Sequence, residues 1–308
     1  MSNLDIIKIE NLNKSYGEVK AVNDLSFKVK KGELFAFLGE NGAGKSTTIS
    51  IICSQLSKDS GKVYIDGLDI DTHSNSAKTK LGVVFQTSVL DKALTVKENL
   101  RCRASLYGIT GQAFINRLSE LSKILNFESI LNRPIGKLSG GQSRKIDIAR
   151  ALIHSPEILI LDEPTTGLDP QTRKLLWQVI DELRKQNNLT VLLTTHYMEE
   201  ASESDYVVII DGGKISEEGT PLELKNQYTG DFIILYNAKE EDVKKLNLPY
   251  EKFKDCIKIS IPNTQVATTL ISKHGHIFTD YEITKGKMDD VFLAVTGKKL
   301  INGGNINE

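Results

Sequence analysis

Apolar and polar positions follow two alternating patterns from residue 4 to about Gly230. Buried central strands are predicted by short, almost uninterrupted apolar runs at residues 34–38, 83–85, 158–161, 191–195 and 207–210. Between residues 22 and 29 apolar positions alternate with polar ones, which predicts a half-buried edge strand. Helical stretches separate these runs. The alternation of strands and helices predicts an α/β domain over residues 1–230.

Two helix starts stand out in this region. Thr95 and Glu98 have the spacing of a capping box and predict a helix that runs to about Tyr107. Asp169 followed by Pro170 provides an N-cap and a proline at the first helical position. Apolar residues then recur on one helical face at Leu175, Leu176, Val179, Ile180 and Leu183.

The pattern changes after Gly230. Residues 232–236, 256–261 and 276–283 are predicted strands, and three short helices that end near residue 295 are interleaved with them. We therefore predict a small α/β accessory domain over residues 231–300. Residues 301–308 are predicted to be a flexible tail.

Composition excludes several classes of protein. The 39 basic and 40 acidic residues give a net charge of −1, so the chain lacks the basic field of a non-specific nucleic-acid binder. Cys53, Cys102 and Cys256 lie far apart, which predicts reduced thiols in a cytosolic compartment. No basic segment followed by an apolar one marks a signal peptide at the start. Apolar runs are far shorter than the roughly 20 residues that cross a bilayer, so we expect no membrane span.

The first chemical signal is a glycine-rich segment between a predicted strand and a predicted helix. This phosphate loop, residues 39–46, lets backbone N–H groups wrap phosphates at a helix start, with Lys45 against the β- and γ-phosphates and Ser46 directed at Mg²⁺. A glycine-rich turn with a surface lysine is the alternative. The candidate nucleotide-binding residues are Gly39, Glu40, Asn41, Gly42, Ala43, Gly44, Lys45, Ser46 and Thr47.

The second signal is a pair of acids, Asp162 and Glu163, that directly follows a buried strand. Asp162 is expected at the carboxyl edge of the sheet, where the phosphate loop also lies, and there it can serve a Mg²⁺ site. Glu163 is the candidate general base for the attacking water. Two acids in this position could instead cap the next turn.

The third signal is the signature segment, residues 138–142. Ser139 and Gln142 have capping-box spacing and predict a helix to about His154, while Gly140 and Gly141 leave the backbone amides uncovered for an anion. A plain helix cap is the alternative for this segment alone.

The order of these three segments resembles the ATP-binding cassette (ABC) ATPase family over about residues 4–228. The resemblance implies a P-loop NTPase with a mostly parallel core sheet, an antiparallel β subdomain and an α-helical signature subdomain. In such ATPases two cassettes dimerise head to tail, and each ATP lies between one phosphate loop and the partner's signature. The cofactors implied are ATP and Mg²⁺.

Four more site residues follow from the resemblance. Gln86 matches the glutamine that contacts Mg²⁺ and water, and His196 matches the histidine at the γ-phosphate. Asp169 matches the aspartate that crosses the dimer interface, and Tyr16 matches the aromatic that stacks on adenine. The implied catalytic residues are thus Glu163, His196 and Gln86, and the implied metal ligands are Ser46, Gln86 and Asp162. Ser143, where relatives often have a basic residue, departs from the pattern.

The end of the predicted accessory domain, residues 288–297, resembles the drug-, sodium- and peptide-export type of cassette. We therefore expect the ATP-hydrolysing subunit of an exporter. It would act as a homodimer or with a second cassette, at the cytoplasmic face of the membrane, on a permease that is a separate chain. The alternatives are an importer, a non-transport ABC ATPase that acts on nucleic acid or ribosomes, and a purely structural P-loop domain. Only about 90 residues separate Lys45 from the signature, too few for the coiled coils of repair cassettes.

Overall fold

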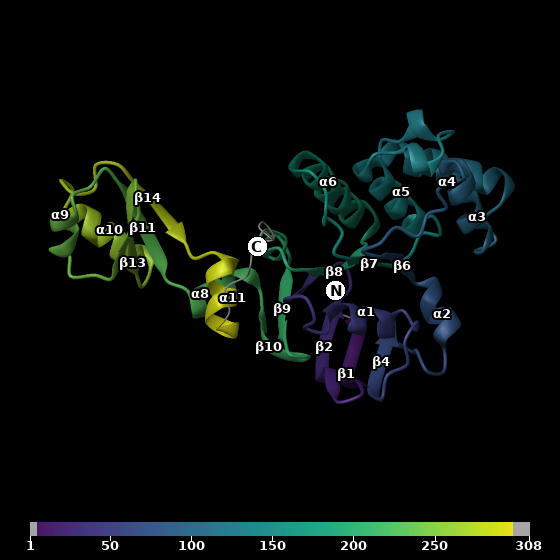
Figure 1. Cartoon of the computed structure of the whole chain (residues 1–308), viewed down its shortest axis with the longest axis horizontal. Helices are drawn as coiled ribbons and strands as arrows, with labels where there is room; N and C mark the ends of the chain where they lie inside the picture. Colours follow the sequence, from purple (N-terminus) through teal and green to yellow (C-terminus); the bar gives the residue numbers. More distant parts are fainter. Residues whose placement is uncertain (1–4, 298–308) are drawn as a thin grey trace, which may run out of the picture.

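The computed structural model describes residues 5–297, apart from the side chains of residues 186 and 187. Figure 1 shows a large main body, which contains the chain up to α8, and a smaller C-terminal module beside it. Within the described residues no helix is both long and apolar enough to span a membrane. The predicted tail at residues 301–308 lies outside the described residues.

A six-stranded sheet forms the centre of the main body, in the order β10-β9-β3-β8-β7-β6. Five strands are parallel, and β10 pairs antiparallel with β9 at the edge. The strands are β3 (Leu34–Leu38), β6 (Leu81–Val84), β7 (Ile158–Asp162), β8 (Thr190–Thr195), β9 (Tyr206–Asp211) and β10 (Lys214–Gly219). All five predicted central strands are confirmed, although β6 lies slightly N-terminal to its predicted range.

The central strands have continuous apolar runs because both faces of the sheet are covered. In β3, Leu34, Ala36 and Leu38 pack in one core with the helices, whereas Phe35 and Phe37 pack in a second core on the other face. Strands of a parallel sheet that is buried on both faces need apolar residues at successive positions rather than at every second one.

The second core lies against an antiparallel sheet with the order β2-β1-β4-β5. Its strands are β1 (Asp5–Tyr16), β2 (Val19–Lys30), β4 (Ser60–Ile65) and β5 (Leu68–Asp69), followed by the short helix α2 (Ser74–Thr79). Strand β2 is at the edge of this sheet, as its alternating pattern predicted. The antiparallel subdomain is therefore confirmed.

Helices cover the other face of the central sheet (Figure 1). They are α3 (Val96–Ser105), α4 (Gly111–Ile124), α5 (Gly140–Leu152) and α6 (Pro170–Asn187), with two 3₁₀ turns at Glu128–Ile130 and Ile135–Lys137. Both predicted capping boxes, Thr95 with Glu98 and Ser139 with Gln142, are present, and Asp169 caps α6. The predicted α/β class is thereby confirmed.

The C-terminal module is a four-stranded antiparallel sheet with the order β12-β13-β11-β14, and two helices. Its elements are β11 (Asp231–Tyr236), α9 (Glu240–Lys244), β12 (Tyr250–Lys252), β13 (Cys256–Ile261), α10 (Thr264–Lys273) and β14 (Tyr281–Lys285). The strand predicted at residues 276–283 in fact begins at Tyr281. Ile277 and Phe278 are buried in the module's core, but they lie in the loop before the strand.

The chain then returns to the main body as α11 (Met288–Thr296). This helix contacts α8 (Pro221–Tyr228), α7 (Met198–Ser202) and β10 (Figure 1). Met288, Val291 and Phe292 are at most 2% exposed and belong to the core that the main-body helices share. The last described helix therefore packs on the main body, although the module precedes it in the sequence.

The two crossings between main body and module touch each other. A Cβ atom at Gly286 would lie 1.8 Å from Oγ1 of Thr229, so only glycine fits at this point. The outgoing chain at Thr229 and the returning chain at Gly286 thus form a narrow, closely packed double connection.

Candidate active site

The phosphate loop connects the carboxyl end of β3 to α1 (Lys45–Ile52). Gly44 has a φ of 107°, and a Cβ there would lie 2.3 Å from the carbonyl oxygen of Ala21. Glycine is required at this position both by the left-handed backbone and by the close approach of β2. This turn points the first N–H groups of α1 at the space beyond the sheet edge, where an anion can bind.

Lys45 is 4% exposed and lies under the loop. Its Nζ donates to the carbonyl oxygens of Gly39 at 2.7 Å and Glu40 at 3.0 Å, and lies 3.6 Å from Oε1 of Glu163. Burial lowers the pKa of the Lys45 ammonium, and the Glu163 carboxylate opposes that shift. The loop therefore holds a cation in place by its own carbonyl groups and one carboxylate.

Asp162 is the last residue of β7 and is 7% exposed. Its Oδ1 accepts a hydrogen bond from Thr194 on β8 at 2.5 Å and lies 3.3 Å from Oγ of Ser46. The carboxylate is thereby fixed beside the Ser46 hydroxyl. These two predicted metal ligands lie together, as the sheet geometry predicted.

Glu163 is the point at which the predicted catalytic residues meet. Its φ of 46° is left-handed, a strained conformation for a side chain of this size. Gln86 Nε2 donates to its Oε2 at 3.1 Å, and His196 Nδ1 lies 3.4 Å from the same oxygen. Together with Lys45, three segments far apart in the sequence place polar groups within 3.6 Å of one buried carboxylate.

Two other segments of the predicted site lie at helix starts, the signature at α5 and Asp169 at α6. Ser139 and Gly140 are exposed at the N-terminus of α5, where Ser139 accepts from the Gln142 N–H at 3.3 Å. Asp169 accepts from the backbone N–H and the hydroxyl of Thr172, and these bonds hold the pKa of Asp169 below its usual value. Each of these segments is thus held in place by its own helix and open to solvent.

Tyr16 ends β1 and is 52% exposed, and the Lys14 ammonium lies 5.9 Å from the centre of its ring. An exposed aromatic ring of this kind can stack on a base. The role of Tyr16 in binding adenine stays a prediction.

Arg144 was missed by sequence reasoning. It is 8% exposed, and its guanidinium donates to the carbonyl oxygens of Phe85 at 2.6 Å, Pro164 at 2.8 Å and Glu163 at 3.2 Å. It therefore ties α5, which begins at the signature, to the backbone beside Gln86 and Glu163. Its partners are main-chain carbonyls, so no side-chain motif in the sequence could indicate them.

The donors present fit a magnesium ion that is bound mainly through a nucleotide. Asp162 and Ser46 offer oxygen atoms, which a hard cation prefers. Among residues 5–297 no cluster of three or more His, Cys, Asp or Glu side chains could hold a metal. Mg²⁺ characteristically binds one or two carboxylates together with substrate phosphates, so such a site needs only a few protein ligands.

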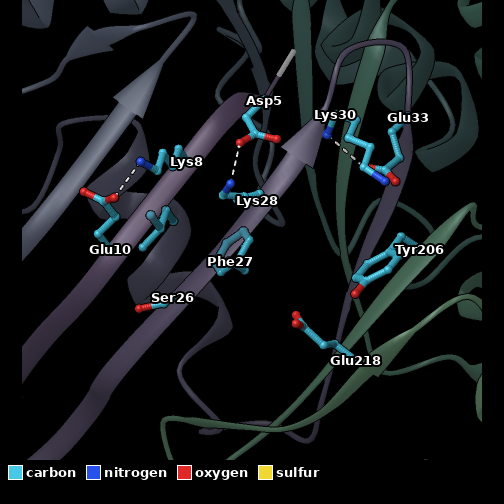
Figure 2. A pocket seen from close by; sticks show the side chains of 11 residues that line it. Asp5, Lys8, Glu10, Ser26, Phe27, Lys28, Lys30, Glu33, Tyr206 and Glu218 are labelled. Carbon is cyan, nitrogen blue, oxygen red and sulfur yellow. Dashed lines mark hydrogen bonds and ion pairs between the residues drawn. The ribbon is translucent and has the colours of Figure 1, made fainter. Parts of the chain in front are cut away.

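A separate groove of about 450 Å³ lies near the opposite end of β3, between the antiparallel sheet and the β9–β10 edge (Figure 2). Four of its charged groups form two ion pairs, Lys8–Glu10 at 2.6 Å and Lys28–Asp5 at 2.8 Å. None of the predicted site residues lines it. Because ligands of open α/β sheets bind beyond the carboxyl ends of the strands, we place the active site at the phosphate loop.

Comparison with known proteins agrees with this geometry. A family model described as "ABC transporter" matches residues 22–166. The chain is 34% identical over 305 residues to the Nod factor export ATP-binding protein I of Ralstonia nicotianae, with 96% of this chain and 95% of that protein covered. It is 40% identical over 317 residues to the linearmycin resistance ATP-binding protein LnrL of Bacillus subtilis, with 96% and 99% covered.

Solved structures give the same result for the main body. The cassette MJ0796, solved as a dimer in a post-hydrolysis state with ADP and phosphate, superposes with a TM-score of 0.64 at 30% sequence identity. The alignment covers 70% of this chain and 98% of that chain.

Proposed function

The chain belongs to the ATP-binding proteins of the ABC transporter family, and from this premise we propose that it couples ATP hydrolysis to export through a separate membrane permease. One observation carries the hydrolytic part of the proposal. The buried Glu163 carboxylate lies within 3.6 Å of Lys45, Gln86 and His196, beside the phosphate loop. The names of the Nod factor and linearmycin relatives support export over import.

Binding depends on the phosphate loop. The N–H groups at the start of α1 and the Lys45 ammonium face the β- and γ-phosphates, while Tyr16 stacks on the adenine. Lys45 donates to the carbonyl oxygens of Gly39 and Glu40, and these bonds keep its ammonium within the loop. Glycines 39, 42 and 44, together with Glu40, Asn41, Ala43 and Thr47, complete the cradle.

Hydrolysis depends on Glu163 as general base. Its carboxylate takes the proton of the attacking water, while the Gln86 amide and the Thr166 hydroxyl both donate to Oε2, at 3.1 and 3.3 Å, and hold the carboxylate in position. His196, 3.4 Å from the same carboxylate, is placed to contact the γ-phosphate as charge develops there. The strained backbone at Glu163 is the means by which the carboxylate is oriented.

Ser46, Asp162 and Gln86 are the residues that would hold Mg²⁺. The ion neutralises phosphate charge when it is bound with the nucleotide. Thr194 keeps the Asp162 carboxylate oriented toward Ser46 for this purpose.

The signature and Asp169 complete the site of a second cassette. Ser139, Gly140, Gly141 and Gln142 offer the open N-terminus of α5 to an anion, and Asp169 reaches across the interface. Two copies, or this chain with another cassette, then enclose ATP between a phosphate loop and a partner's signature. The assembly sits at the cytoplasmic face of the membrane through its permease.

We also propose the division of the chain into an ATP-binding domain over residues 1–230 and an accessory domain over residues 231–300. In this division α11 is the part of the accessory domain that docks on the ATP-binding domain.

The hydrolytic part is tested by Glu163→Gln. This change keeps the size of the side chain and removes the base, so ATP binding should persist while turnover falls by roughly 10²–10⁴-fold. The matched control is Glu199→Gln, an exposed acid on α7 that should leave turnover unchanged. Turnover of Glu163→Gln within twofold of the control would refute Glu163 as the base.

A further inference from the structure

A second buried carboxylate, Glu200, lies behind the active site. Glu200 is on α7, is 6% exposed, and accepts hydrogen bonds from two threonine hydroxyls. Thr195 Oγ1 donates to its Oε2 at 2.6 Å, and Thr165 Oγ1 donates to its Oε1. Both threonines are fully buried. One carboxylate therefore joins three segments of the chain.

Both threonines stand directly beside the proposed machinery. Thr195 is the last residue of β8 and precedes His196, and its Oγ1 also accepts from the backbone N–H of Tyr197 at 2.9 Å. The peptide that follows His196 is thus fixed by the hydroxyl that also binds Glu200. Thr165 lies in the loop that leads from Glu163 to Asp169.

A second link joins the same two loops. Arg173 donates from Nε to the carbonyl oxygen of Leu168 at 3.2 Å, next to Asp169. Its guanidinium also lies 4.6 Å from the ring centre of Tyr197, next to His196. The loop at His196 and the loop at Asp169 are therefore tied together both at the buried carboxylate and at the base of α6.

We propose that Glu200 is a positioning residue for ATP hydrolysis, which sets the loop carrying His196 and the loop leading to Asp169 in one fixed relation. The inference rests on the proposed function, because it assigns Glu200 a part in the same reaction. Glu200 is almost fully buried, and in this role it acts through the hydroxyls of the two threonines. In the head-to-tail dimer, His196 serves its own site and Asp169 the partner's, so Glu200 links the geometry of the two sites.

Simple burial does not explain this carboxylate. Burial raises the pKa of Glu200, while the hydroxyls of Thr165 and Thr195 oppose the shift. A buried carboxylate is costly unless it is hydrogen-bonded, and an apolar residue would fill the same space more cheaply. Here the hydrogen bonds end on Thr195, the strand residue before His196, and on Thr165 in the loop after Glu163, which is the arrangement a positioning role requires.

The test compares Glu200→Ala with Glu199→Ala, an exposed acid one residue earlier on the same helix, in the full chain. Loss of the bridge should lower kcat by roughly 10²-fold, since small misplacements of catalytic groups have effects of this size. The KM for ATP should stay within about twofold, because the phosphate loop meets this network only at the main-chain carbonyl oxygen of Thr195, to which the Gly39 N–H donates at 3.3 Å. Glu200→Gln, which can still hydrogen-bond both threonines, should recover most of kcat.

Thr165→Val provides a second variant that removes one arm without deleting the carboxylate. Its kcat should fall at unchanged KM, even if Glu200→Ala proves too unstable to purify. The proposal is overturned if Glu200→Ala and Thr165→Val keep kcat within twofold of Glu199→Ala, or if the loss lies in KM. A parent chain with no ATPase activity would instead overturn the proposed function, so the two failures are distinguishable.

Discussion

Phe292→Ala should destabilise the main body, although Phe292 lies more than 60 residues beyond Tyr228, the last residue of α8. Phe292 is 1% exposed and packs in the core shared with the main-body helices. Truncation of such a phenylalanine costs about 3–5 kcal/mol, a large share of the roughly 5–15 kcal/mol that stabilises a typical domain. With a urea m-value of about 3 kcal/mol/M, the unfolding midpoint should fall by about 1–2 M.

The assay uses the only tryptophan of the chain. Trp177 lies on α6 and is packed against the same core, so its fluorescence reports unfolding of the main body and not of the C-terminal module. The matched control is Leu293→Ala, since Leu293 is the next residue and is 37% exposed. Equal midpoints for Phe292→Ala and Leu293→Ala would refute the argument that α11 belongs to the core of the main body.

Three further predictions concern the double connection, the sharing of sites between two copies, and the buried His154. Excision of residues 231–285, which joins Gly230 to Gly286, should leave a folded ATP-binding chain because Thr229 and Gly286 already touch. A stop after Gly230 removes α11 as well, so the urea midpoint reported by Trp177 fluorescence should fall. A one-to-one mixture of inactive Lys45→Ala and Ser139→Arg chains should regain roughly a quarter of the activity if sites are shared between two copies, and no recovery in a single-turnover assay with confirmed mixed dimers would refute sharing. Burial lowers the pKa of His154 to about 4 from its ordinary 6.5. As the pH falls, the His154 imidazole is therefore protonated in the unfolded chain before it is protonated in the folded chain, so the stability present above about pH 6.5 is lost as the pH falls toward 4. Between these pH values the urea midpoint of His154→Gln should fall less than that of the unsubstituted chain.

The sequence predicted those parts of the molecule that are recorded in short, contiguous patterns. The phosphate loop, the acids after β7 and the capped helices α3, α5 and α6 each need only neighbouring residues, so their positions were predictable. The prediction assigned Gln86, His196 and Lys45 to the same nucleotide site as Glu163, and the structure adds that all three lie within 3.6 Å of the Glu163 carboxylate. Their roles in catalysis stay predictions.

Other features depend on contacts between distant segments and left no local pattern. Ile277 and Phe278 have the composition of a strand, but they fill the module's core from a loop. Arg144 binds main-chain carbonyls, and Glu200, next to the exposed Glu199, has the local pattern of a second surface acid. The return of α11 to α7 and α8 could not be deduced, because any small apolar helix could have packed inside the module instead.

The double connection at Thr229 and Gly286 attaches the C-terminal module to the main body through two chain segments. A domain joined by one chain segment can rotate about single bonds, whereas two segments in contact, as at Thr229 and Gly286, resist both twisting and bending. A rotation of the module therefore moves α11. Helix α11 packs against α7, the helix that follows His196. A label attached at Gly297 would therefore report motion of the main body, while a label on the loop between β12 and β13 would report rotation of the C-terminal module relative to it.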